Sequence, residues 1–414
     1  MSHVQPIHWL YFGAGRLLVA LRRSLSSLAR PLGSTPWPKN LSFPLTAQCN
    51  YRCGFCEIVG VNGLLRSQGL PYNANPMTAE HFRPFSPLIQ VANSIDFGGM
   101  TGLGEPLLSP HRESVIRAIR DLNRAAMLCL TTNASLLKPE LSDLLARNAP
   151  LHVTFSLHAA SPEVYGRMMG PHFEHVIENI RYFCRKTRTM PDVRTRINFG
   201  FGKFNYMDAE AIVLLAQDLG IDAVNMYPYY KSPNRFVEDM SLYSDPELAN
   251  RTLDAAYQTA RQTGQRMIPP QPAYLQPNAA RPTPGQSYTG GCRLPFENFI
   301  LKSAPLLKDR TAFCVCNRIV LFTCRLDKEL PFEDIVWMWN HPALNALRFP
   351  QGHVPEICRF CKSPDTPWLR SLDQEEYKRR RDQSVREHLA RYQDDKISPS
   401  QSIELLSENI FSID

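Results

Sequence analysis

Between residues 41 and 227, two patterns of apolar positions alternate along the chain. Short apolar runs of strand length alternate with longer segments in which apolar residues recur every three or four positions, as in amphipathic helices. The strand-like runs are residues 41–47, 94–97, 127–132, 152–157, 194–201 and 223–227. The helix-like segments are residues 78–91, 111–124, 139–147, 173–186 and 208–219. This alternation predicts an α/β protein.

The six predicted strands are not separated by strong hairpin turns. Strands joined through helices favour a parallel sheet with the helices outside it. Six repeats are fewer than the eight of a closed (β/α)8 barrel. We therefore expect a partial, TIM-like (β/α)6 barrel over residues 41–240, with its ligands beyond the carboxyl ends of the strands.

Regions of different composition flank this barrel. Residues 241–290 form a Pro-rich bridge with one predicted helix at 246–263, and the prolines of 268–291 exclude regular structure there. A small cysteine-rich domain is expected over residues 291–370. The tail, residues 371–414, has mixed charges at helical spacing, which predicts a solvated surface helix, with a basic partner-binding face as the alternative.

The first 40 residues form a basic amphipathic segment and linker. No acidic residue precedes Glu57, and apolar residues recur at helical spacing between Trp9 and Ala29. The segment fits a helix packed on the barrel, a helix on an anionic membrane surface, or an organelle transit peptide. Arginines interrupt its apolar run well before the ~20 residues that a membrane-spanning helix needs.

Composition narrows the class of protein. The chain has 414 residues, 43% of them hydrophobic, which is enough for two or three domains. Its 46 basic and 39 acidic residues give a net charge of +7, and this mild excess does not require a nucleic-acid partner. The 11 cysteines occur without a signal-peptide pattern, which favours metal ligation over disulfides and a reducing, cytoplasmic location.

One short loop carries the strongest chemical signal. Residues 45–59 read LTAQCNYRCGFCEIV and place Cys49, Cys53 and Cys56 in the spacing Cys-x3-Cys-x2-Cys. Three thiolates on one loop can hold three irons of a [4Fe–4S] cluster and leave the fourth iron open to a small molecule. A closed structural site would have four protein ligands. The alternatives are chance proximity or a partial zinc site.

This loop resembles that of the radical S-adenosylmethionine (SAM) enzymes. The resemblance implies that Cys49, Cys53 and Cys56 hold the cluster and that SAM chelates its open iron. It further implies that an electron, from a donor such as flavodoxin or ferredoxin, cleaves SAM to a 5′-deoxyadenosyl radical that abstracts hydrogen from a substrate. Phe55, the aromatic residue before the third cysteine, is grouped with the expected cofactor-binding residues.

The resemblance extends to the segment after the second predicted strand. GLGEPLL, residues 102–108, is similar to the Gly-Gly-Glu motif of that family, whose glutamate region receives the SAM amino group. Leu103 replaces the first glycine, so only Gly104 and Glu105 are carried over. A purely structural glycine turn is the alternative.

The ends of the later strands supply further candidates for SAM binding. Asn133 follows the third strand in TTNA, where many relatives have TTNG, and a turn cap is an equal alternative. By resemblance, Ser156 approaches the SAM ribose or carboxylate. Arg167 fits a carboxylate partner or a solvated helix residue. No catalytic residue is assigned, and the other expected cavity residues are His158, Asn198, Lys203, Asn205, Asn225, Tyr227, Tyr229 and Tyr230.

The cysteine-rich domain resembles the SPASM or twitch extension of radical SAM enzymes. Its six cysteines are fewer than the seven of a full SPASM pattern, and their spacing is altered. The resemblance implies one auxiliary [4Fe–4S] cluster, bound by Cys292, Cys358, Cys361 and one of Cys314 or Cys316. Cys324 is spare, structural or a ligand of a second cluster. A zinc ribbon is the alternative.

The resemblance leaves the substrate open. The ~40 residues before the barrel are fewer than the about 80–90 of a leader-peptide domain, which favours a small molecule such as a saccharide or specialised metabolite. The alternatives are a peptide- or protein-modifying maturase, an RNA-modifying enzyme, and a non-catalytic iron–sulfur or zinc scaffold. In an epimerisation, one of Cys129, Cys184 or Cys324 would return the hydrogen atom, although single cysteines are usually packing residues.

Overall fold

The computed structural model describes the barrel and parts of the chain that follow it. The described residues are 37–56, 76–98, 104–229, 240–242, 244–272, 274–275, 298–303, 310–316, 319–325, 332–348, 383, 387 and 403–405. The predicted N-terminal helix and most of the predicted tail helix lie outside these ranges.

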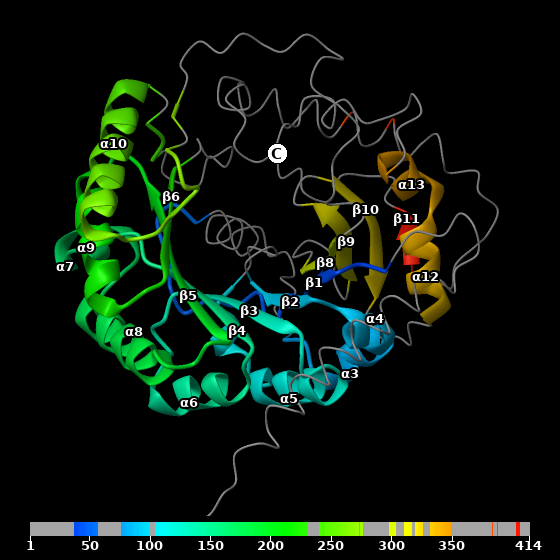
Figure 1. Cartoon of the computed structure of the whole chain (residues 1–414). Helices are drawn as coiled ribbons and strands as arrows, with labels where there is room; N and C mark the ends of the chain where they lie inside the picture. The colour runs from blue at the N-terminus through cyan, green and yellow to red at the C-terminus, as the bar shows by residue number, and fades with distance from the viewer. Residues whose placement is uncertain are drawn as a thin grey trace, which may run out of the picture.

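One curved sheet organises the described residues (Figure 1). Eight of its strands are parallel, in the order β8-β1-β2-β3-β4-β5-β6-β7. They are β1 (Asn40–Ser42), β2 (Ser94–Phe97), β3 (Met127–Thr132), β4 (Leu151–Ser156), β5 (Val193–Phe201), β6 (Ala223–Pro228), β7 (Met267–Ile268) and β8 (Asn298–Ser303). Within the described residues β7 ends the sheet on one side, so the barrel is open.

Three antiparallel strands continue the sheet beyond β8. They are β9 (Arg310–Cys316), β10 (Ile319–Arg325) and β11 (Ile403–Leu405). The cysteine-rich region therefore shares a sheet with the barrel, because β8 pairs directly with β1. A hydrogen bond of 3.0 Å between the side chains of Asn40 and Asn298 joins these two strands.

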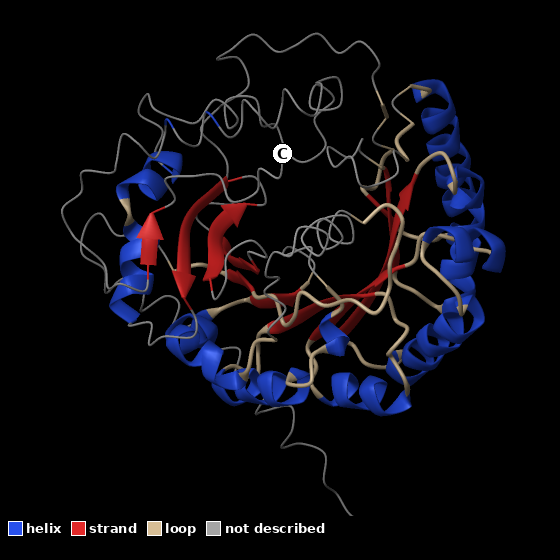
Figure 2. Ribbon diagram, turned by 180° about the vertical axis from the view of Figure 1, so that it is seen from behind, coloured by secondary structure: helices blue, strands red, loops and turns tan. Residues whose placement is uncertain are grey.

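The helices form an outer arc around the sheet in both views (Figures 1 and 2). Those of the barrel are α3 (Ala79–Phe82), α4 (Ser86–Val91), α5 (Arg112–Leu122), α6 (Pro139–Arg147), α7 (Pro162–Met168), α8 (Phe173–Thr187), α9 (Ala209–Leu219) and α10 (Pro246–Thr263). Helices α12 (Phe332–Asn340) and α13 (Pro342–Arg348) lie beside the antiparallel strands. Short 3-10 turns are η1 (Arg83–Phe85), η2 (Pro106–Leu108) and η3 (Tyr206–Asp208).

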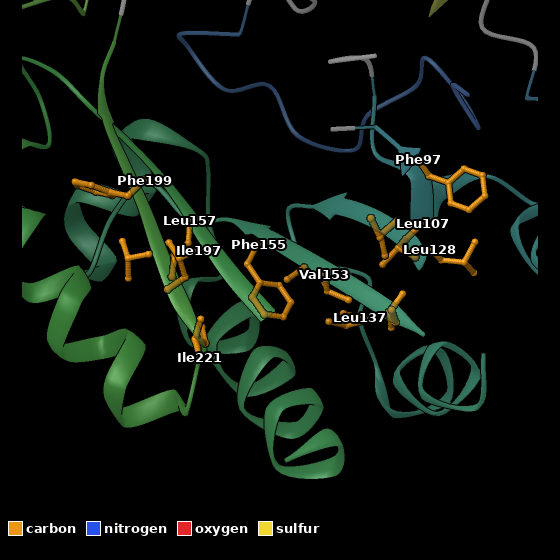
Figure 3. Packing of buried hydrophobic residues seen from close by; sticks show 14 of the residues in the cluster. Phe97, Leu107, Leu128, Leu137, Val153, Phe155, Leu157, Ile197, Phe199 and Ile221 are labelled. Atoms are coloured by element: carbon orange, nitrogen blue, oxygen red, sulfur yellow. The ribbon is translucent and has the colours of Figure 1, made fainter. Parts of the chain in front are cut away.

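Between the strands and the helices lies an apolar core (Figure 3). Alternate residues of β2 and β3 are buried, whereas those between them are only partly buried. The buried set includes Leu128, Val153 and Ile197, and the ring of Phe155 packs edge-on against Phe183 of α8 at 6.1 Å. The barrel thus presents one apolar face to its helices and a second, more polar face to its concave side.

The predicted partial barrel is confirmed in its strands and helices. Strands 94–97 and 127–132 and helices 139–147 and 246–263 have the predicted bounds. The last of these begins where expected because Asp245 accepts a hydrogen bond from the Leu248 amide and Pro246 occupies the first helical position.

Five details differ from the prediction. The sheet is wider than six strands, because β7 and β8 add parallel strands at its two sides. Ile268 lies in β7 although no regular structure was expected there, and residues 403–405 of the tail form a strand rather than a helix. Pro84 divides the predicted helix 78–91 into α3, η1 and α4, and α7 was not predicted. No helix among the described residues is long and apolar enough to cross a membrane.

Candidate active site

The cysteine loop lies directly after β1, where the chain leaves the carboxyl end of that strand. Cys49 is exposed, Cys53 and Cys56 are half-buried, and all three are reduced thiols. The Cys56 amide donates to the Cys53 carbonyl at 3.0 Å, which makes a tight turn between the second and third cysteines. The Cys53 thiol donates to the carbonyl of Met169, just beyond α7, at 3.9 Å.

Surrounding protein keeps the first two of these thiols neutral when nothing binds them. Although Cys49 is exposed, desolvation by the protein around its sulfur raises its pKa to about 11, and burial raises the pKa of Cys53 to about 12. The neighbouring cysteines add further increases. A bound metal reverses this tendency, because a coordinating thiol loses its proton outright. Thiols clustered in this way therefore suit a metal-bearing group.

The three cysteines offer the thiolate donors of an iron–sulfur cluster. In the described part of the chain, no three or more His, Cys, Asp or Glu side chains converge on one metal position. In a [4Fe–4S] cluster the cysteines bind different irons, so their sulfurs need not converge on one point. Cys49, Cys53 and Cys56 offer soft thiolate donors of the kind such clusters take. The donor set fits a [4Fe–4S] cluster with one iron open.

Gly104 brings a second segment against the base of this loop. A Cβ atom at this position would lie 2.4 Å from the Thr46 carbonyl oxygen and 2.6 Å from that of Gln48. Gly104 also has φ +69°, in the left-handed region that glycine adopts without strain. The next residue, Glu105, donates its amide to the Gln48 carbonyl at 2.7 Å. The glycine thus permits direct backbone contact with the cysteine loop.

The Glu105 carboxylate points to the end of β3. It is 2% exposed, and it accepts hydrogen bonds from the Thr132 hydroxyl at 2.7 Å and from the amides of Asn133 at 2.7 Å and Leu107 at 3.1 Å. Burial raises the pKa of Glu105 to about 7, although these three donors oppose the shift. Its carboxylate therefore fixes the β3 end, and its backbone fixes the cysteine loop.

Asn133 completes this link. Its side-chain nitrogen, Nδ2, donates to the Asn50 side-chain oxygen at 3.1 Å and to the Cys49 sulfur at 3.9 Å. Its side-chain oxygen accepts from the amide and hydroxyl of Ser135. Asn133 thus caps the turn after β3 and contacts the cysteine loop, whereas its expected role in SAM binding stays a prediction.

An aromatic group stands beside the loop. The Phe55 ring packs against His158 at 5.1 Å and against Tyr229 at 4.9 Å. His158 accepts a hydrogen bond from the Gly200 amide on Nδ1, and burial lowers its pKa to about 4, so its ring is neutral. A Cβ at Gly200 would lie 2.7 Å from the Tyr229 ring, so glycine makes room for that ring.

Tyr229 carries an unusual hydroxyl. The oxygen is buried and makes no hydrogen bond to the described residues, and burial raises the Tyr229 pKa well above its usual value. Among the causes of that increase are Cys53 and Cys56. An unpartnered hydroxyl beside the loop is a donor available to a bound ligand.

The remaining candidate site residues lie partly on the concave face of the sheet and partly on helix α7. Ser156, Asn198 and Asn225 are register neighbours on β4, β5 and β6, and the Asn225 side chain donates to Asn198 at 2.9 Å. Arg167 is exposed on α7, with its guanidinium 4.0 Å from the centre of the Phe204 ring.

One expectation for a cavity residue does not match the geometry. Asn205 is fully buried, and its side chain bonds the backbone of Gly202, Gly200 and His158, so it braces the loop after β5 and does not line a cavity. Lys203 is exposed on the same loop. Tyr227 is half-buried on β6, and Tyr230 lies outside the described residues.

The predicted auxiliary-cluster ligands are not brought together by described residues. Cys314 and Cys316 lie on β9, and Cys324 lies on β10. Cys292, Cys358 and Cys361 lie outside the described residues. The auxiliary cluster therefore stays a prediction. Of the suggested hydrogen donors, Cys184 is buried in α8, whereas Cys129 is half-buried on β3.

Sequence reasoning missed several residues on the concave face. Arg196 lies there on β5, two residues before Asn198, and Asp96 lies there on β2. The alternation of polar residues in VRTRINFGF was a usable signal for Arg196.

Comparison with known proteins bears on this geometry. Residues 43–216 match the model of the Radical SAM superfamily. The chain is 34% identical over 145 residues to a probable GTP 3′,8-cyclase of Thermococcus kodakarensis, covering 34% of this chain and 42% of that relative. It is 27% identical over 192 residues to a probable GTP 3′,8-cyclase of Saccharolobus solfataricus, covering 45% of this chain and 56% of the relative. The chain thus spans about half the length of the curated relatives that it matches.

Structural comparison supports the fold. The crystal structure of Streptococcus suis SuiB bound to S-adenosylmethionine superposes with a TM-score of 0.54 at 17% identity, over 84% of this chain and 76% of that one. At this identity the similarity shows the fold alone.

Residues 43–216, which include the cysteine loop and most of the barrel, are thus similar to radical SAM domains. This match supports the prediction of an enzyme that uses a [4Fe–4S] cluster and SAM. The SPASM or twitch identity of the C-terminal region remains a prediction.

Proposed function

We propose that the protein is a radical SAM enzyme that abstracts hydrogen from a small-molecule substrate on the concave face of its sheet. The observation that carries this proposal is the position of the three thiols, Cys49, Cys53 and Cys56, beside the carboxyl ends of the parallel strands. Asn133, at the end of β3, reaches the first of these thiols. Ligands of parallel α/β sheets bind at this end.

The residues have separable roles in this proposal. Cys49, Cys53 and Cys56 hold the cluster, which together with SAM supplies a carbon-centred radical for hydrogen abstraction. Glu105 and Asn133 hold the cysteine loop against β2 and β3 through their hydrogen bonds. Phe55, His158 and Tyr229 form an aromatic wall that packs beside the loop, and its proposed role is to limit the access of water to reactive intermediates.

SAM is proposed to lie between this wall and the strand ends. Ser156 and the Tyr229 hydroxyl supply hydrogen-bond partners there. Arg167 is a weaker candidate, because its guanidinium is already stacked on Phe204 and exposed. Glu105 acts on SAM only through the backbone around it, since both of its carboxylate oxygens are already used by the protein.

A small molecule is the proposed substrate class. The curated relatives are named as probable cyclases of GTP, a small molecule, and this supports the choice. The polar residues of the concave face also suit a compact polar ligand. A purine nucleoside triphosphate is the first substrate to test.

The test is anaerobic SAM cleavage by the reconstituted full-length protein. With a strong reductant, the wild type is expected to release 5′-deoxyadenosine, and a Cys49/Cys53/Cys56→Ala triple variant is expected to release none. The triple variant should also hold about four fewer irons. Cys184→Ala serves as the matched control, because Cys184 is a buried thiol of α8 away from the loop.

Iron content also separates the alternatives. A protein that binds about four irons on the loop but never cleaves SAM would be an iron–sulfur scaffold, and the enzyme proposal would be abandoned. About eight irons in the wild type would support an auxiliary cluster, with Cys292, Cys358, Cys361 and one of Cys314 or Cys316 as proposed ligands.

A further inference from the structure

The concave face of the sheet carries polar side chains from neighbouring strands. Because side chains alternate along a strand, every second residue faces away from the helices. Asp96, Cys129, His152, Arg196 and Tyr227 are half-buried, whereas their strand neighbours are mostly fully buried. The strand register places Thr131, Thr154 and Arg196 in one row, with Ser156, Asn198 and Asn225 in the row nearer the carboxyl ends.

Arg196 is a cation of this face without a counter-ion among the described residues. Its Nη2 donates to the Thr154 hydroxyl at 3.1 Å, and its Nε is buried without a hydrogen-bond partner in that part of the chain. No described carboxylate forms an ion pair with it. Burial outweighs every other influence and lowers the pKa of Arg196. A half-buried guanidinium with an unused N–H is costly unless an anion meets it.

The charged groups around Arg196 do not supply that anion. Asp96 lies on β2, three strands away in the sheet order, and its carboxylate accepts from the Ser42 hydroxyl at 2.9 Å. Its charge acts to raise the Arg196 pKa, but it forms no ion pair with the guanidinium. His152 is neutral because burial, followed by the charge of Arg196, lowers its pKa to about 4. Cys129 is a neutral thiol because burial raises its pKa to about 12. Among the described residues, no anion is therefore paired with the Arg196 guanidinium.

A second donor lies on the way from Arg196 to the cysteine loop. Asn198 is two residues further along β5, about 7 Å nearer the carboxyl end of the strand. One atom of its amide accepts from Asn225 at 2.9 Å, and the other makes no hydrogen bond to a described residue. A ligand held by Arg196 would therefore extend past Asn198 toward the end of the sheet where the cysteine loop lies.

We propose that Arg196 is a substrate-binding residue that anchors an oxyanion, a phosphate or a carboxylate, of the small-molecule substrate. Asn198 contacts the same ligand nearer the strand ends, and the reacting carbon lies beyond it. The planar guanidinium can donate two parallel hydrogen bonds to either type of oxyanion. The identity of this ligand as substrate rests on the proposed function, whereas the anion site stands on the geometry of β4 and β5.

The test measures anion binding by calorimetry on the full-length reconstituted protein. Pyrophosphate and citrate are the phosphate and carboxylate probes, and GTP with guanosine forms a pair that differs only in the triphosphate. Arg196→Gln is expected to weaken binding of at least one anionic probe by about ten- to a hundredfold, with guanosine unaffected. Arg196→Lys should restore part of the affinity, since it keeps the charge and loses the fork.

Arg194→Gln is the matched control. Arg194 lies on the same strand, is exposed, and donates to the carbonyls of Pro191 and Val193. Its substitution should change binding less than about twofold. Weakening in the pyrophosphate and GTP arms assigns a phosphate, and weakening in the citrate arm assigns a carboxylate.

The proposal is overturned if no anionic probe binds the wild type, or if Arg196→Gln binds every probe as tightly as Arg194→Gln does. Thermal unfolding of Arg196→Gln checks that the variant is folded. If it is not, Arg196→Lys takes its place, and the proposal then requires that Arg196→Lys bind the anionic probes more weakly than Arg194→Gln does. Anion binding and 5′-deoxyadenosine release are separate measurements, so loss of SAM cleavage alone would remove the proposed function and leave the anion site standing.

Discussion

Gly104 occupies a position where only a hydrogen atom fits in place of a side chain. Its left-handed backbone and its contact with the Thr46 and Gln48 carbonyls both exclude a Cβ. Glu105 follows it and uses its backbone for the cysteine loop and its side chain for β3. Two adjacent residues therefore fix the geometry of a loop more than 45 residues earlier in the chain.

Gly104→Ala is expected to lower the free energy of unfolding by about 3 kcal/mol, from left-handed strain and overpacking against backbone. The variant should also retain less iron, since the loop must move to relieve the contact. Gly54→Ala is the control, because a Cβ there would meet nothing within 4 Å although Gly54 lies between two of the cysteines. Chemical denaturation and iron analysis measure both effects. Equal stability of the Gly104→Ala and Gly54→Ala variants would contradict this account.

Because His158 is buried, we expect the stability of the fold to depend on pH. Its folded-state pKa is about 4 against 6.5 for an ordinary histidine, and the cause is burial. Between these values the unfolded chain binds more protons, so the contribution of His158 to stability is present above about pH 6.5 and is lost as the pH falls toward 4. His158→Asn keeps an acceptor for the Gly200 amide but does not titrate.

The wild type should therefore lose roughly 2 kcal/mol more than His158→Asn between about pH 6.5 and about pH 5, measured by urea unfolding. Glu105 and His152 titrate in both proteins, so their effects cancel in the comparison. Equal losses in the two proteins would show that the pKa of His158 in the folded state is the ordinary one and is not lowered by burial.

At the scale of secondary-structure elements, one arginine binds the backbone segments that precede two strands. Arg120 of α5 is 7% exposed and donates to the carbonyls of Asn123, Arg124, Ala126, Asn148 and Pro150. These carbonyls precede β3 and β4, so one guanidinium satisfies the backbone where two strands begin. Burial lowers the Arg120 pKa to about 10, which still leaves it charged at neutral pH.

Arg120→Met is expected to lower the free energy of unfolding by about 3 kcal/mol or more, because it leaves buried carbonyls without donors. Arg117→Met on the same helix is the control. Arg117 is exposed and its ion pair is with Glu113, one turn away, so its loss should cost under about 0.5 kcal/mol. Denaturant unfolding of the two variants measures the difference. Similar costs would mean that the carbonyls find other partners when Arg120 is gone.

At the scale of the whole molecule, the barrel and the region after it share one core. Phe299 of β8 is fully buried, with its ring 5.7 Å from Phe85 of the barrel and 6.3 Å from Trp339 of α12. Because β8 pairs with β1, separating the barrel from the region after it would leave the edges of both strands unpaired. The C-terminal region is thus a continuation of the barrel sheet in the described residues.

Phe299→Ala should therefore destabilise the barrel as well as the strands after it, by about 3–5 kcal/mol. Calorimetry should show the main unfolding transition moving as a whole to lower temperature. Met207→Ala, at a residue that is 58% exposed, should leave the transition within about 0.5 kcal/mol of the wild type. A variant in which a minor transition shifts while the main one stays would show that the two regions unfold independently.

Local sequence pattern was enough to predict the cysteine loop and most strands and helices of this protein. Cys49, Cys53 and Cys56 were found by spacing alone, and most strand and helix bounds followed from periodicity, because backbone conformation depends mainly on residues a few positions apart. Capping residues such as Asp245 fixed a helix start for the same reason.

Only the tertiary structure decided which distant groups meet. The Asn40–Asn298 contact spans 258 positions, and no local pattern predicts that β8 pairs with β1. The inward turn of the Glu105 carboxylate depends on the end of β3, and the surroundings of the Arg196 guanidinium depend on the register of β4 and β5. Sequence periodicity fixes which face of a strand a side chain occupies, whereas sheet order and register decide what that side chain finds opposite it.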